Sequence, residues 1–206
     1  MKSLGYSFVG ALVCLCAAGS YAGTVQKFQA NGVSATATLC NNDCFGGEAL
    51  ITLLQSQGGG QNLYYVYFDV YGSDSQGNLT DINATGQIPA SMVSGNGQSN
   101  LVLNLDTNAA GLDVKYCVID QNFNHTCTPY AGGVMNVTWQ KTGQYTNSNT
   151  GINTMTFTNF TVKSNFNSTT SSATAQGTIF GTQYSPGGDL TQLGTGHNGG
   201  IEIDKP

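Results

Sequence analysis

The sequence predicts an all-β protein, a mostly antiparallel β-sandwich or jelly roll of about ten strands with very little helix. Three observations support this prediction. Apolar and polar residues alternate with a period of two along several segments, turn-forming residues separate those segments, and Asn, Thr, Ser and Gly are abundant throughout. These abundant residues disfavour helix, because Asn, Thr and Ser compete for backbone hydrogen bonds and Gly loses much entropy when it is ordered.

The alternation is clearest in residues 33–39, where apolar side chains alternate with Ser and Thr. It returns in residues 63–71, 82–88, 101–106, 135–140, 154–158 and 173–179. Such a pattern is typical of strands that bury one face. Turns are expected at residues 58–60, 74–78, 95–97 and 186–188. Residues 48–55 also fit a short helix, but a Gly-rich turn and a strong strand pattern follow them, so we expect a strand.

Residues 1–22 have the pattern of a secretory signal peptide. Lys2 supplies the positive end, residues 8–18 form the apolar stretch, and Ser20-Tyr21-Ala22 has the small-x-small pattern of a cleavage site. We therefore expect cleavage after Ala22 and a secreted, extracellular protein. The apolar stretch is too short to span a bilayer, so no stable membrane insertion is expected. No Pro-rich or charged linker divides residues 23–206, which are expected to form a single domain.

Charged residues are rare and of limited kinds. They make up 8% of the 206 residues, and all six basic residues are Lys. A nucleic-acid partner is not expected, because such proteins need a positive patch to neutralise phosphates and usually use Arg to do so. The sequence contains neither the G-x-S-x-G nor the H-E-x-x-H motif, and we expect no cofactor.

Four cysteines follow the signal segment, namely Cys40, Cys44, Cys117 and Cys127. An even number in an exported protein indicates two disulfides, with three pairings open. We favour Cys40 with Cys44 and Cys117 with Cys127, because each pair brackets a short polar turn. A four-thiolate zinc site is the alternative, but nine residues between the last two thiols do not fit the usual ligand spacing.

The segment Leu63–Tyr71 is the richest in aromatic residues. As a strand it places Tyr65, Tyr67, Asp69 and Tyr71 on one face. Tyrosine rings stack on sugars and a carboxylate accepts hydroxyl hydrogen bonds, so these four residues are the candidate ligand-binding residues. The more ordinary interpretation is a central strand whose second face is covered by loops. An exposed aromatic patch would favour binding.

The remaining candidates for chemistry are weaker. Asp69 stands alone in an apolar strand, so burial would raise its pKa and make it the best single acid. His125 and His197 lack a neighbouring nucleophile motif and are expected to be turn residues. The oxygen-rich segment 74–81 could hold calcium, but it lacks the start and the terminal Glu of an EF-hand loop, and a hairpin turn explains it equally well.

These observations favour a secreted, non-catalytic protein that binds a glycan or an extracellular protein, or forms part of a surface or matrix. The first alternative is a secreted hydrolase acting on polysaccharide, with Asp69 as its acid. The second is a self-assembling extracellular subunit, because Thr/Asn-rich strand edges with few Lys residues lack the usual protection against strand addition. Binding predicts an exposed aromatic row, catalysis a cleft with two carboxylates, and assembly an uncovered edge or a loose strand at residues 24–29. The sequence leaves the oligomeric state open.

Overall fold

The computed structural model describes residues 25–41, 47–58, 61–156, 160–187 and 190–204, so the predicted signal segment and Cys44 lie outside it. Every strand pairing is antiparallel, and the one short helix is the 3-10 turn Ala90–Met92. The strands are β1 (Val25–Cys40), β2 (Glu48–Gly58), β3 (Gln61–Ser73), β4 (Leu79–Ile88), β5 (Val93–Gly95), β6 (Asn100–Asp106), β7 (Lys115–Ile119), β8 (His125–Pro129), β9 (Val134–Thr156), β10 (Phe160–Ile179), β11 (Thr182–Pro186) and β12 (Gln192–Asp204). The predicted all-β, antiparallel fold is confirmed, and residues 48–55 are strand. Among the described residues, no helix has the length and apolar character needed to cross a membrane.

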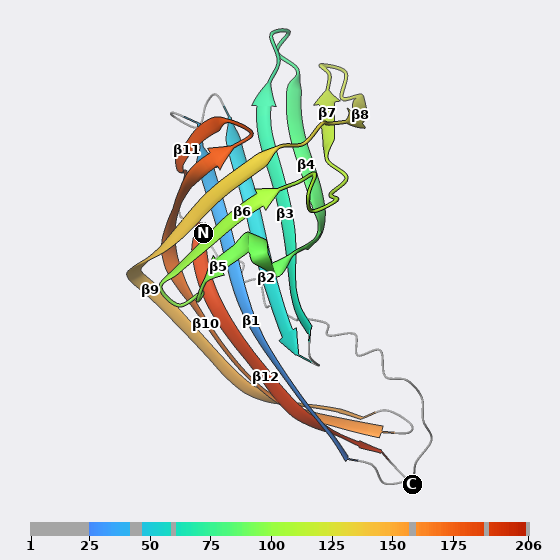
Figure 1. Ribbon diagram of the computed structural model, residues 1–206, viewed down its shortest axis with the longest axis vertical. Coiled ribbons are helices and arrows are strands. Elements are labelled where there is room, and N and C mark those ends of the chain that lie inside the picture. Colours follow the sequence, from blue (N-terminus) through green and yellow to red (C-terminus); the bar gives the residue numbers. More distant parts are fainter. Residues whose placement is uncertain (1–24, 42–46, 59–60, 157–159, 188–189, 205–206) are drawn as a thin grey trace.

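All twelve strands belong to one hydrogen-bonded sheet. Its order is β5-β6-β9-β10-β11-β1-β2-β3-β4-β7-β8, and β12 lies between β1 and β10. The sheet curls, so that β6 and the first part of β9 cross in front of β1, β2 and β3 (Figure 1). The two packed layers of this sandwich are thus parts of a single folded sheet.

The hydrophobic core lies between these two layers. Leu103, Val137 and Trp139 of the crossing layer are fully buried, as are Ile51 and Phe68 of the layer behind them. Trp139 also joins the layers through a hydrogen bond, because its Nε1 donates to the backbone oxygen of Thr36 at 2.9 Å. The alternation in the sequence reflects this packing, since every second side chain of the strands that line the two layers enters the core. We call this part of the molecule the two-layer region.

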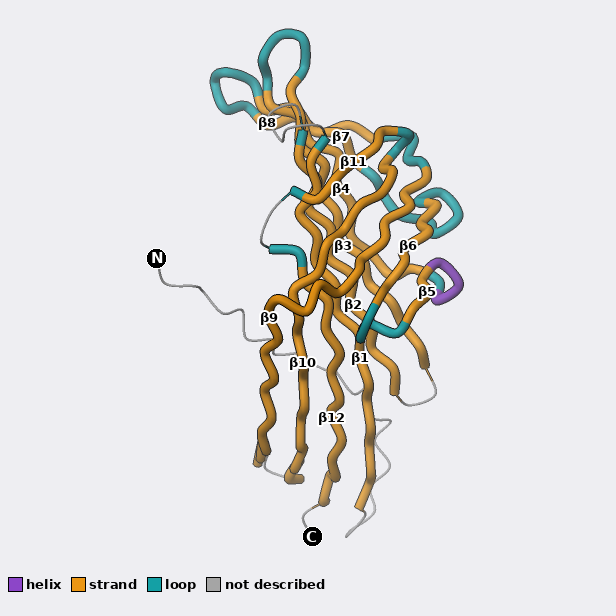
Figure 2. Tube along the Cα trace, turned by 90° about the vertical axis from the view of Figure 1, so that its left-hand side faces the viewer, coloured by secondary structure: helices purple, strands orange, loops and turns teal. Residues whose placement is uncertain are grey.

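Below the two-layer region the sheet continues as a single layer of four strands. Its order is β9-β10-β12-β1, and it consists of residues 146–156, 160–171, 193–204 and 25–34 (Figure 2). At its upper end Leu193 still enters the core, and residues 30–34 of β1 also pair with β2. The strand β9 enters it through an irregularity at residues 142–145, where its register against β10 shifts and Gly143 has φ 75°. We call this part the extension. Phe157 and the side chain of Met155, which the sequence placed on an apolar face, lie outside the described parts of the extension.

Candidate functional site

β3 is a central strand between β2 and β4, as the more ordinary interpretation expected, but loops do not cover its outer face. Tyr65, Tyr67 and Tyr71 keep 45%, 39% and 44% of their surface exposed, whereas Val66 and Phe68 between them are buried. Asp69 shares the outer face with the tyrosines but is only 7% exposed. The predicted alternation of this strand is therefore confirmed, and its polar-aromatic side faces solvent.

The strand register brings further candidate residues onto the same face. Residues directly opposite one another on paired strands point to the same side of a sheet. Asp69 lies opposite Asn83 of β4, Tyr71 opposite Asp81, and Asp81 opposite Cys117 of β7. We call the outward side of these strands the tyrosine face. Its members are Tyr65, Tyr67, Asp69 and Tyr71 of β3, Leu79, Asp81, Asn83 and Thr85 of β4, Lys115, Cys117 and Ile119 of β7, and His125 and Cys127 of β8.

Asp69 organises the tyrosine hydroxyls around it. The hydroxyl of Tyr67 donates to Asp69 Oδ2 at 3.0 Å. Hydrogen bonding to Asp69 is the main cause that raises the pKa of Tyr71, with burial second, while burial and then Asp69 raise the pKa of Tyr67. Both hydroxyls therefore stay protonated and direct their protons toward the carboxylate. Their oxygen lone pairs remain available to accept hydrogen bonds from a ligand.

The second carboxylate on this face is Asp81. Burial raises its pKa, and the charge of Asp69 raises it further, while the hydrogen bond from Asn83 Nδ2 to Asp81 Oδ1 (2.8 Å) and the nearby His125 act in the opposite direction. Asp69 Oδ1 is buried and has no hydrogen-bond partner among the described residues. Leaving a buried polar atom without a partner costs free energy, so this oxygen lacks the hydrogen-bond donor that its burial calls for.

A disulfide closes one side of the tyrosine face. Cys117 and Cys127 are joined, as predicted, with their Cα atoms 4.0 Å apart across β7 and β8. His125 Nε2 lies 3.5 Å from Cys127 Sγ, and together with the two cysteines it forms the cluster whose atoms could contact a metal. Because both sulfurs are bonded to each other, this cluster is not a thiolate zinc site. Cys40 is also disulfide-bonded, but Cys44 lies outside the described residues, so their pairing stays a prediction.

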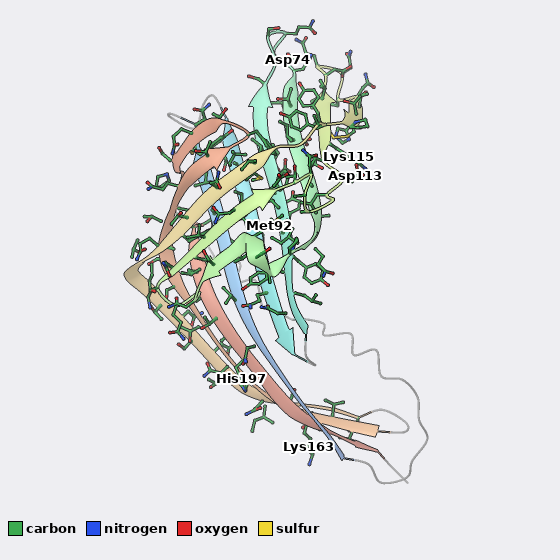
Figure 3. The ribbon with its side chains drawn as sticks, viewed as in Figure 1. Asp74, Met92, Asp113, Lys115, Lys163 and His197 are labelled. Atoms are coloured by element: carbon green, nitrogen blue, oxygen red, sulfur yellow. A yellow bond between two sulfur atoms is a disulfide. The ribbon has the colours of Figure 1, made fainter. Side chains whose placement is uncertain are left out.

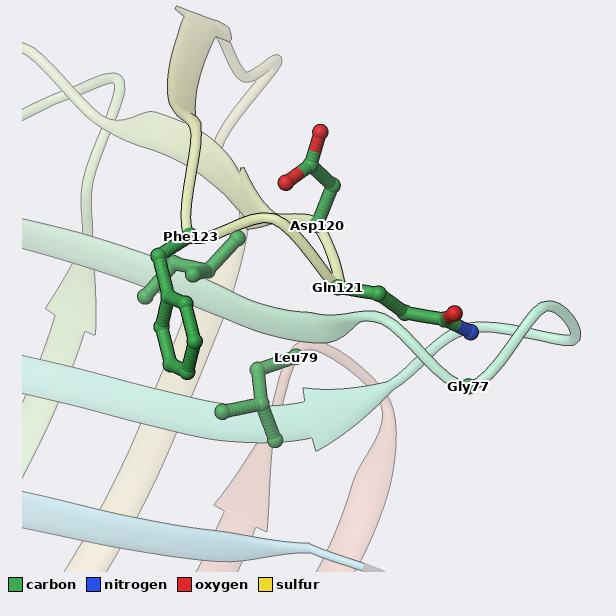
Figure 4. Close-up of a pocket in the computed structure, with 6 residues that line it drawn as sticks. Gly77, Leu79, Asp120, Gln121 and Phe123 are labelled. Atoms are coloured by element: carbon green, nitrogen blue, oxygen red, sulfur yellow. The ribbon is translucent and has the colours of Figure 1, made fainter.

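The tyrosine face ends in an exposed apolar pocket. Phe123 is 88% exposed and Leu79 is 61% exposed, and both line a pocket of about 160 Å³ (Figure 4). Of the nine large apolar side chains exposed in the described residues, five are thus on this face or at its end. Phe123 has φ 63°, a left-handed conformation that costs a residue with a Cβ atom about 1 kcal/mol or more.

The two hairpin loops at this end are built alike. Asp74 Oδ1 accepts hydrogen bonds from the backbone N–H groups of Gln76 and Asn78, and its Oδ2 accepts one from Asn78 Nδ2. Asp120 makes the same set of bonds to the residues two and four positions later. These bonds lower the pKa of both aspartates. A hairpin turn therefore accounts for segment 74–81, whose first carboxylate is already engaged by the loop.

A second cavity lies where the extension meets the two-layer region. It has a volume of about 430 Å³ and is lined mainly by amide and hydroxyl side chains, among them Asn31, Gln55 and Asn96, together with the imidazole of His197. His197 Nδ1 lies 2.6 Å from Asn31 Oδ1, and its strand runs down the extension (Figure 3). Neither this cavity nor the apolar pocket is lined by two carboxylates. The cleft expected for a hydrolase is thus not formed by either cavity.

Sequence reasoning missed Asp81, Leu79 and Phe123 as parts of the site. The hairpin that joins β3 and β4 carried a usable signal, because a turn centred on residues 74–78 places Tyr71 opposite Asp81. Phe123 carried no such signal, since an exposed aromatic residue in a loop cannot be told from a buried one by pattern.

Comparison with models of protein families, with curated proteins and with solved structures gives no match.

Proposed function

We propose that the protein is an extracellular binding protein that binds carbohydrate through its tyrosine face. The observation that carries this proposal is the exposed row of Tyr65, Tyr67 and Tyr71 around the buried carboxylate of Asp69. Residues 1–22 support the compartment, because their sequence has the three parts of a secretory signal.

The chemistry of the face suits a neutral, hydroxyl-rich ligand. Tyrosine rings offer apolar surface to the C–H faces of a sugar, and their hydroxyl oxygens accept hydrogen bonds because their protons point to Asp69. The row from Tyr65 to Tyr71 is about 20 Å long at about 3.4 Å per residue, so it can contact several sugar units of an extended chain. Lys115, which lies 3.7 Å from Asp113, shares the face with the two carboxylates of Asp69 and Asp81, so the face does not favour an anionic ligand (Figure 3).

A glycan array probed with the mature protein, residues 23–206, tests this proposal. We expect binding to a set of neutral oligosaccharides, with an affinity that changes little with salt. Calorimetry on one bound glycan then compares Tyr65→Ala and Tyr67→Ala with Phe166→Ala, which removes an exposed ring from the extension. Each tyrosine variant should bind at least about ten-fold more weakly, a loss of about 1.4 kcal/mol, and the control should bind normally.

Tyr67→Phe separates the two contributions of that residue. It keeps the ring and removes the hydroxyl, so its affinity should fall between those of the original protein and Tyr67→Ala. An array with no bound glycan, or tyrosine variants that bind as well as the original, would remove the proposal.

A further inference from the structure

The long free edge of β9 in the extension differs from the other ends of the sheet. The strands at the two ends of the sheet order, β5 and β8, have only three and five residues, and β8 ends in Pro129. Short strands and Pro are usual ways to protect an edge from pairing. In β9, by contrast, residues 146–156 pair with β10 on one side and with no described strand on the other.

No charged side chain guards this edge. Residues 146–156 contain no Asp, Glu, Lys, Arg or Pro. Residues 146–150 are all exposed polar residues, and Ile152, near the middle of the edge, is 84% exposed. A regular strand of this length presents about one unpaired backbone N–H or C=O group per residue at its outer side, ready to pair with another strand.

We infer that two copies of the protein pair through residues 146–156 of β9 and form a symmetric dimer. A two-fold axis perpendicular to a strand makes the strand and its image antiparallel, so the edge can pair with a second copy of itself. Because the edge carries no charged residue, no like charges meet when the two copies of residues 146–156 face one another in opposite directions. The result is one continuous sheet of eight strands across the two extensions, in the order β1-β12-β10-β9 and then the same strands reversed. Thr and Asn side chains across the seam would hydrogen bond to one another.

Lysine substitutions at the edge test this inference. In the double variant Thr150→Lys, Ile152→Lys, four lysines would come together at the seam. The matched control is Asn167→Lys, Asn165→Lys, because these residues lie directly opposite Thr150 and Ile152 on β10 and are also exposed. The control adds the same charge to the same face, but one strand farther from the seam.

Sedimentation equilibrium of the mature protein, from low micromolar to near millimolar concentration, gives the dissociation constant of the dimer. We expect a monomer–dimer equilibrium that changes little with salt, because the edge carries no charge. The edge variant should raise the dissociation constant by about ten-fold or more, and the control should leave it within a few-fold. Far-ultraviolet circular dichroism establishes that both variants keep the fold.

Hydrogen exchange locates the interface. Amides of residues 146–156 should become better protected as the concentration rises, while those of β3 should not change. A protein that stays monomeric at every concentration would overturn the inference. So would a dimer whose protection appears elsewhere, or one that both variants weaken equally. None of these outcomes affects the glycan proposal, which rests on a different face.

Discussion

The strand β9 passes through two different environments, and the contrast separates the effect of backbone pairing from the effect of side-chain burial. Its first part lies in the two-layer region, where Trp139 is fully buried and bonded to Thr36 of the opposite layer. Its second part lies in the extension, where Ile152 is 84% exposed. Both parts pair with β10 in the same way. Backbone pairing alone therefore forms the strand, but burial of a side chain requires a second layer, and stability should be concentrated where that layer exists.

The largest effect is expected from Trp139→Ala compared with Ile152→Ala. The first substitution removes a buried ring and the hydrogen bond between the layers, so it should lower the free energy of unfolding by about 3–5 kcal/mol. The second should change it by no more than about 0.5 kcal/mol, because Ile152 already faces solvent. Urea denaturation at a concentration where the protein is monomeric measures both. A large decrease in the free energy of unfolding for Ile152→Ala would show that the side chain of Ile152 is packed, and it would contradict the proposed difference between the two regions.

A smaller effect is expected from the same substitution at two glycines. A Cβ added to Gly177 would overlap the backbone oxygen of Asn136 and lie 2.8 Å from Val137 Cα, within the two-layer region. Gly177→Ala should therefore cost about 1–3 kcal/mol. At Gly196, in the extension, the nearest atom is 3.9 Å away, so Gly196→Ala should stabilise the fold by about 0.5 kcal/mol. Thermal unfolding of the two variants should give opposite signs, because only Gly177 is closely approached by the backbone of its paired strand.

The smallest effect is expected in the pH dependence of stability, and it comes from the tyrosines on the outer face of the two-layer region. The pKa values of Tyr67 and Tyr71 are raised above 10, so the stability they contribute is fully present below pH 10 and is lost as the pH rises through the raised values. Asp69→Asn should move the pKa of both tyrosines back toward 10. Tyr184 is the internal control, because burial alone raises its pKa. Ultraviolet titration of tyrosinate measures the change, and an unaltered curve in Asp69→Asn would contradict the assigned role of this carboxylate.

Much of the fold could be predicted because it follows from local pattern. Alternation placed the outward row of β3 correctly, and the polar turn between Cys117 and Cys127 indicated their disulfide. The curl of one sheet into two layers was not predictable, because it depends on non-local pairings such as Thr36 with Gln192. Exposure of the tyrosines also escaped prediction, since sequence cannot tell which face of a strand with two plausible sides a loop will cover. The position of Asp81 and Asn83 beside Asp69 required the register of β3 and β4 as well.

The neighbouring positions of the first and last strands have a consequence for the order of folding. Val25 of β1 pairs with Ile203 of β12, so the two ends of the described chain are joined along one side of the extension. The strand β1 cannot complete its pairing with β12 until nearly all the chain has been synthesised. Sheets that pair such distant segments fold slowly, because the entropy of loop closure is lost before the contacts between the strands lower the free energy. A chain of this topology is therefore expected to complete its fold only after its last strand has been synthesised.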